Sequence, residues 1–276
     1  MFNQIKSDLY KLQHSLVLKL FLIIIMLLFG TYIAMSFSYE GFAMGYSIEK
    51  VKGYDLVHGF MTFAFDNAAV PTYMEVIYSS VSMTFFMWML LLVVTIMTFS
   101  KEFTTGSIKL AYAKGNSKIK LLWSKLIIVC GVFFSVYLPF NILAYIYTSL
   151  KYGTGMSSGG FADVILSSVL MFLPMVIMSY MAMTLFLLFQ NAALVISSMV
   201  IFMFSYVFID IGMQISQSNP FIVQLYSVIN PMSYIWVACN YWADSALIRN
   251  VILYFVLGFI ILSGLSWYLL EKREVK

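Results

Sequence analysis

The sequence predicts an all-α integral membrane protein with six transmembrane helices in a single domain, residues 1–276. Hydrophobic residues make up 62% of the chain and charged residues 10%, and the mean hydropathy is +0.92. Such a composition lies far outside the range of soluble domains. A bilayer core about 30 Å thick requires roughly 20 apolar residues per helix. Six runs of this size fill most of the chain, and the gaps between them are too short to bury a core of their own.

The first element is an amphipathic helix over residues 1–15, MFNQIKSDLYKLQHS, in which apolar residues recur every three or four positions. We expect it to lie in the inner headgroup layer of the membrane. The alternative is a plain helical extension of the first span. That span has lysines before it, but it is too long for a signal peptide and no small-residue cleavage site follows it. We therefore expect an uncleaved anchor.

The expected spans cover residues 16–37, 74–99, 121–150, 161–189, 192–211 and 248–270. With six spans, both termini lie on one side of the membrane. That side holds most of the cations: Lys6, Lys11, Lys19, Lys101, Lys109, Lys114, Lys118, Lys120, Lys125, Lys272, Arg273 and Lys276. Because short cytoplasmic segments carry an excess of lysine and arginine, we expect both termini in the cytoplasm.

Three connections are expected on the outer side. Residues 38–73 contain scattered glycines and aromatic residues without a period and predict a loop with short helices. Residues 151–160, KYGTGMSSGG, predict a simple turn. Residues 212–247 are too apolar for a solvated loop and too short for a hairpin across the bilayer, so we expect one or two short helices that re-enter the outer leaflet. The alternative is a hydrophobic external cap.

The chain contains none of the common catalytic motifs. It has no G-x-x-x-x-G-K-[ST] phosphate loop, no H-E-x-x-H, no C-x-x-C and no G-x-S-x-G, and its two histidines are expected on opposite sides of the membrane. We therefore expect no catalytic residue, no metal site and no cofactor in this chain, and no nucleic-acid partner. Charged residues near the outer ends of the spans, at Glu75, Asp163, Asp210 and Arg249, are interpreted as solvated end-caps. Pro139 with Asn141, and Pro174, are interpreted as helix kinks.

The only long cytoplasmic loop has a pattern of its own. It reads SKEFTTGSIKLAYAKGNSKIKLLWSK, residues 100–125. A charged start and a Thr-Thr-Gly break are followed by a short amphipathic piece with Ile108, Leu110 and Tyr112. A KGNSKIK turn follows, residues 114–120, in which Ser117 can cap the third span.

This loop resembles that of type-2 ATP-binding-cassette (ABC) transporter permeases, a family of six-helix exporters. In that family an E-x-x-x-G-[ST] element and a short coupling helix follow the second span. Glu102, Gly106 and Ser107 match the element, and Lys118 stands where an arginine is common. Lys125 stands where a lysine often begins the third span. The turn QNAALVISSMVIF and the segment INPMSYI are also similar to family segments. A KGN turn in place of a Pro-containing one is a departure.

The resemblance implies a permease that dimerises with an identical copy or a paralogue in the bacterial plasma membrane. A separate ATPase subunit would bind ATP and Mg²⁺ and drive the export of a hydrophobic or amphipathic substrate. Peptides, antibiotics and lipid-like molecules fit that description, as in systems for peptide transport, antibiotic resistance or immunity. The implied coupling residues are Glu102, Gly106, Ser107, Ile108, Tyr112, Lys114 and Lys118. The resemblance leaves the substrate-binding residues unknown, and the lysines would also face membrane lipids.

Two readings from other classes remain open. One is a polytopic membrane enzyme or assembly factor that acts on lipid at the outer face through Glu75, Asp163, Asp210 or Asp244, with no ATPase partner. The other is a channel, which the lack of a polar stripe along any span disfavours. The basic loop itself has a plain alternative, an ordinary positively charged loop without a partner. Its Thr-Gly break and its apolar face argue against that.

Overall fold

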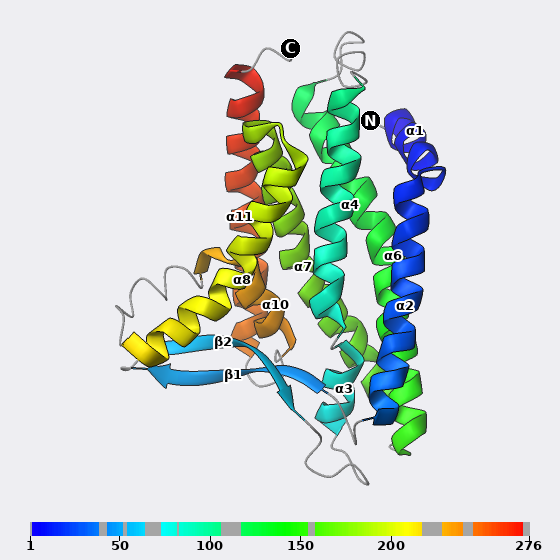
Figure 1. Ribbon diagram of the computed structural model, residues 1–276, viewed down its shortest axis with the longest axis vertical. Helices are drawn as coiled ribbons and strands as arrows, with labels where there is room; N and C mark the ends of the chain where they lie inside the picture. Colours follow the sequence, from blue (N-terminus) through cyan, green and yellow to red (C-terminus); the bar gives the residue numbers. More distant parts are fainter. Residues whose placement is uncertain are drawn as a thin grey trace.

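The structure, a computed structural model, is a bundle of long helices with one short β-hairpin at one end (Figure 1). It describes residues 2–38, 43–51, 54–63, 73–81, 83–105, 117–153, 158–216, 228–239 and 245–272. For 2–5, 35–38, 43–51, 54–63, 206–216 and several single residues it describes only the backbone. Apart from the hairpin, the regular secondary structure in these ranges is helical. Within the described residues, five helical stretches are long and apolar enough to cross a membrane, so this is a membrane-spanning protein.

The long helices follow the predicted spans closely. They are α2 (Leu16–Ser38), α4 (Thr84–Thr104), α6 (Lys118–Tyr152), α7 (Ser158–Phe189), α8 (Ala192–Ser216) and α11 (Ser245–Lys272). The five stretches of membrane-spanning length lie in α2, in α3 with α4, in α6, in α7 and in α11. The apolar stretch described in α8, Ala192–Ser205, is shorter than the others. Helix α8 thus corresponds to the fifth predicted span, and its described apolar stretch is shorter than those of the other spans.

The amino-terminal helix α1 (Phe2–Gln13) was predicted from periodicity and is present. It packs against both α2 and α6, and Leu12 is buried. Tyr10 and Lys11 are exposed. Part of the apolar side of α1 therefore faces protein, and its position in a headgroup layer stays a prediction.

The second predicted span is two helices, not one. Helix α3 (Tyr73–Val81) ends before Met83, and α4 begins at Thr84. The sequence between Ser79 and Thr84 contains four hydroxyl residues. Such side chains form hydrogen bonds to nearby backbone and thereby compete with the helix. Ser80 Oγ donates to Val76 O at 2.6 Å, and the Thr84 hydroxyl bonds Tyr137 OH across to α6 at 3.0 Å. The apolar count missed this break because it ignores these local bonds.

The first outer connection was predicted wrongly. In place of a loop with short helices, the structure has an antiparallel hairpin of β1 (Ala43–Val51) and β2 (Tyr54–Phe63). Its register includes Val51 opposite Tyr54 and Ala43 opposite Phe63, with an irregularity between Gly45 and Ser47. An irregularity of this kind shifts the alternation of the side chains by one residue. That shift explains why no sustained period was visible in the sequence.

The segment before the last span contains a short helix, as predicted. Helix α10 (Pro231–Cys239) packs against α7 and α11, and its start is fixed by the buried Asn230. Asn230 Oδ1 accepts from the amide of Met232 at 2.9 Å, while Nδ2 donates to the Phe202 carbonyl of α8 at 3.1 Å. Residues 217–227 and 240–244 lie outside the described part of the chain.

The turn between α7 and α8 is tight. Gln190 has a positive φ of 53°, and its amide donates to Phe186 O at 2.8 Å. Asn191 Oδ1 accepts from the amide of Leu194 at 3.1 Å and so caps the start of α8. Two residues therefore suffice to reverse the chain.

A buried tyrosine joins helix α2 to two other helices through hydrogen bonds. Only 17% of the apolar window of α2 is buried, yet Tyr32 is 1% exposed. The Tyr32 hydroxyl hydrogen-bonds Ser79 of α3 at 3.0 Å and also Thr148 of α6. In lipid, where apolar burial does not drive helices together, such bonds contribute to association.

We expect Tyr32→Phe to lower the free energy of unfolding in micelles by about 1–2 kcal/mol, because two buried hydroxyls lose a partner. Thermal unfolding of purified protein measures this. Tyr10→Phe, at an exposed position, is the control and should leave the midpoint unchanged. An equal effect of the two substitutions would contradict the role of Tyr32.

Candidate functional site

The predicted coupling residues divide into a described and an undescribed part. Glu102 and Lys118 belong to the described ranges. Gly106, Ser107, Ile108, Tyr112 and Lys114 lie within residues 106–116, outside the described residues. The site is therefore built from the helix ends on either side, at the end of the bundle that also carries α1 and the last turn of α11 (Figure 1).

An ion pair joins α4 to α6 at this end. Glu102 in the last turn of α4 accepts a hydrogen bond and a salt bridge from Lys125 Nζ of α6. The Lys125 side chain is 5% exposed and that of Glu102 15%, so the pair is largely shielded from water. Breaking such a pair on one side leaves a charge without compensation. The pair thus fixes where the second span ends relative to the third.

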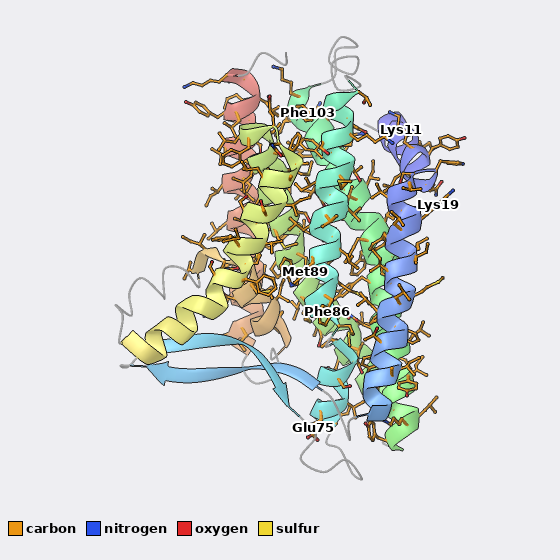
Figure 2. The ribbon with its side chains drawn as sticks, viewed as in Figure 1. Lys11, Lys19, Glu75, Phe86, Met89 and Phe103 are labelled. Atoms are coloured by element: carbon orange, nitrogen blue, oxygen red, sulfur yellow. The ribbon has the colours of Figure 1, made fainter. Side chains whose placement is uncertain are left out.

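A cluster of three phenylalanines packs beside this ion pair. Phe99 and Phe103 of α4 lie with ring centroids 5.0 Å apart, and both contact Phe186 of α7 at 5.6 and 5.4 Å. All three pairs are edge-to-face, the arrangement that aromatic rings prefer. Figure 2 shows Phe103 near the upper end of α4. The end of α4 is therefore attached to α7 as well as to α6.

A second lysine joins α6 to α11. Lys118, the first residue of α6, donates from Nζ to the Leu270 carbonyl at 2.9 Å. Ser117 occupies the N-cap position with extended backbone, as predicted, but its side chain makes no capping hydrogen bond. The Ser117 prediction is therefore correct for the position and wrong for the bond.

Polar contacts continue between α6, α7 and α11. Trp123 Nε1 donates to Tyr180 OH at 3.0 Å, and Tyr180 OH donates to Ser263 Oγ at 3.0 Å. One turn further along α7, the Thr184 and Ser266 hydroxyls lie 2.8 Å apart. These bonds and the contacts of the two lysines link α4, α6, α7 and α11 near this end of the bundle.

Charges at the opposite end have separate surroundings. Glu75, in the first turn of α3, is buried at the far end of the bundle from Phe103 (Figure 2). Asp163 accepts a hydrogen bond from Tyr73 OH, and Arg249 is exposed. The end-cap interpretation is therefore wrong for Glu75 with respect to solvation. The side chains of Asp210 and Asp244 lie outside the described part.

Within the described residues, no three of His, Cys, Asp and Glu group as metal ligands.

The three residues interpreted as helix kinks lie inside long helices, and the kinks themselves stay a prediction. Pro139 lies inside α6 and Pro174 inside α7. Asn141 is fully buried, and its Nδ2 donates to Ser168 Oγ of α7 at 2.9 Å. Asn141 thus joins two helices.

Sequence reasoning did not place Lys125, Trp123 and Tyr180 among the site residues. Lys125 carried a usable signal, because a lysine four residues inside an apolar run is costly unless it finds an anion. Trp123 and Tyr180 carried none, since aromatic residues are abundant throughout the chain. A comparison of the chain with protein families and with curated proteins finds no match in either.

Proposed function

We propose that this chain is the membrane-spanning permease subunit of a bacterial ABC exporter and that a separate ATPase subunit drives it. The observation that supports this best is the ion pair of Glu102 with Lys125. Glu102 begins the E-x-x-x-G-[ST] element, and the pair fixes that element to the start of the third span. A positively charged loop without a partner would need no such attachment between its flanking helices.

The proposed orientation places the Glu102 end in the cytoplasm. Exposed lysines gather there, including Lys11 and Lys19 in Figure 2, while Glu75 lies at the other end. This distribution follows the rule that cytoplasmic segments hold the excess of lysine and arginine. Helix α8 then serves as the fifth of six spans, and α10 lies in the outer leaflet, where α7 and α11 cover part of its surface.

In this proposal the chain transmits force and does no bond chemistry. Its sequence contains no phosphate loop, so ATP and Mg²⁺ belong to the partner subunit. Residues 106–116 would contact the ATPase, and the ion pair and phenylalanine cluster would pass its movement to α4, α6 and α7. The resemblance implies a dimer. The exposed side of α4, with Phe86, Val93 and Met97, offers an apolar face for a second copy or a paralogue.

The apolar character of the spans favours one class of substrate. The spans present mainly apolar side chains, and several of the buried hydroxyls described in them, such as those of Thr84, Thr148 and Thr184, bond other protein groups. A hydrophilic ligand would find few partners there, so an amphipathic or hydrophobic substrate fits best. Antimicrobial peptides, antibiotics and lipid-like molecules belong to this class.

The test is recovery and stimulation of an ATPase. Tagged protein purified from native membranes should bring down a stoichiometric P-loop ATPase. In reconstituted complexes, Glu102→Ala or Gly106→Pro should reduce permease-stimulated ATP turnover about tenfold, within the range that coupling free energies of 1–3 kcal/mol produce.

Glu271→Ala provides a matched control, since Glu271 is an exposed glutamate at the same end of the bundle. It should leave the turnover unchanged. Full stimulation in both the Glu102 and Gly106 variants would contradict the coupling assignment. Recovery of no ATPase at all would favour the lipid-acting alternative.

A further inference from the structure

We infer that Lys118 connects the last helix, α11, to the coupling region, so that a displacement of the start of α6 is passed directly to the end of α11. This inference rests on the proposed function and adds α11 to the parts that move. Lys118 is a positioning residue in this scheme, because it acts through the helix that it holds.

The contact matches a charged donor to an unsatisfied acceptor. Lys118 Nζ lies 2.9 Å from the Leu270 carbonyl oxygen, and α11 ends at Lys272. The last four carbonyls of a helix have no amide partner within it, and Leu270 is one of these residues. A cation at this position also interacts favourably with the negative end of the helix dipole. Leu270 is 4% exposed, so competition from water for the contact is reduced.

The start of α6 would not otherwise favour a lysine. The helix begins Lys118-Ile119-Lys120 and has no acidic residue in its first turn. Positive charge near a helix amino terminus is unfavourable, because the terminus itself is partly positive. Ser117 adds no side-chain cap to offset this. The bond to Leu270 therefore gives Lys118 a role that α6 alone does not.

Helix α11 depends on such contacts more than its neighbours do. Only 6% of its apolar window is buried, against 44% for α6 and 50% for α7. Its described hydrogen bonds to α6 and α7 lie on the half near Leu270: Ser263 with Tyr180, Ser266 with Thr184, and Leu270 with Lys118. On the other half, Tyr254 donates to the Ile229 carbonyl before α10 at 3.1 Å. Trp123 of α6 bonds the same Tyr180. A shift of the first turns of α6 therefore reaches α11 both directly and through α7.

Lys118 lies next to the proposed ATPase contact in the sequence. Residues 106–116, which the proposal assigns to the ATPase contact, are followed in the sequence by Ser117 and Lys118. Lys118 is thus the first described residue after that segment to bond another helix through its side chain. Lys125, the other lysine of the network, is seven residues further along and bonds α4 instead.

Three variants distinguish the loss of the hydrogen bond from Lys118 to Leu270 from the mere loss of a positive charge. Lys118→Met removes the ammonium and keeps an unbranched side chain that suits a helix. Lys118→Arg keeps a cationic donor. Lys120→Met removes the same charge two residues away, at an exposed position in the same turn, and serves as the matched control.

The first measurement needs no ATPase. Spin labels at Ser117→Cys and Glu271→Cys, both exposed positions, report the distance between the start of α6 and the end of α11 in lipid nanodiscs. Cys130 and Cys239 are replaced by alanine in this background. We expect a narrow distribution in the parent protein, in Lys118→Arg and in Lys120→Met, and a clearly broader one in Lys118→Met.

The second measurement uses the ATPase recovered with the wild-type protein. Lys118→Met should bind it in the same stoichiometry but stimulate it about fivefold less, at the lower end of measured coupling between sites. Lys118→Arg should restore most of the stimulation, and Lys120→Met should match the parent.

Each outcome is decisive. An unchanged distance distribution in Lys118→Met overturns the connection, whatever the ATPase does. A broader distribution with full stimulation shows that the connection exists but lies outside the coupling path, and overturns the inference. If no ATPase is recovered with wild-type protein, the proposed function fails and the coupling role fails with it. The spin-label result still decides on the Lys118 contact, which keeps the two failures distinct.

Discussion

Lys125→Met is expected to lower the free energy of unfolding by about 3–5 kcal/mol, the usual cost of leaving one partner of a buried ion pair uncompensated. The Lys125 side chain is 5% exposed and its partner Glu102 is 15% exposed, so little water can replace the lost contact. Unfolding of the purified protein in a mixed-micelle titration provides the measurement. The midpoint should fall while the helical content of the folded state stays the same.

The double variant Glu102→Gln with Lys125→Met identifies the cause of that loss. It removes both charges and keeps side chains of similar size, so most of the stability should return. A double-mutant cycle over the two positions should give a coupling energy within about 0.5–3 kcal/mol, the range for residues in direct contact. Additive losses would show that the two side chains stabilise the protein separately, and would contradict the ion pair as the attachment of α4 to α6.

The sequence was sufficient for the long helices because their signal is repeated over many residues. Runs such as residues 121–150 and 161–189 fall inside α6 and α7, because a helix satisfies the polar backbone groups of an apolar segment within the membrane. The errors occur where a few local bonds decide the structure. Hydroxyl groups between Ser79 and Thr84 accompany the break between α3 and α4, and the irregularity after Gly45 hides the strand period.

The sequence allowed residues of the candidate site to be chosen, but it did not reveal their partners on other helices. Glu102 and Lys118 were chosen because they resemble a family pattern, and both have defined partners in the structure. Their partners could not be inferred, since Leu270 acts through its backbone carbonyl, which no sequence pattern reports. Lys125 was visible as a lysine at the start of an apolar run, but the choice between lipid headgroup and carboxylate required the packing of α4 on α6.

Trp88→Ala should cause the second large loss of stability, about 3 kcal/mol, near the lower end of the values for removing a buried aromatic ring. Trp88 is fully buried in α4, and its ring centroid lies 6.1 Å from that of Phe204 in α8. In a membrane the transfer term of such a substitution is reduced, because lipid is itself apolar. The cavity term remains, since lipid tails cannot enter a closed space between α4, α7 and α8.

Phe86→Ala supplies the control for Trp88, because it removes a ring of similar kind from the same helix two residues away. Phe86 is 36% exposed, and Figure 2 shows it with Met89 on the side of α4 that faces the viewer. Its loss should cost less than about 1 kcal/mol in the monomer, as expected when little cavity is created.

If this side of α4 meets a second copy, Phe86→Ala should instead weaken the dimer in analytical ultracentrifugation. Trp88→Ala would lower the unfolding midpoint at every protein concentration. Equal losses of monomer stability in the two variants would contradict the distinction between a packed and an open side of α4.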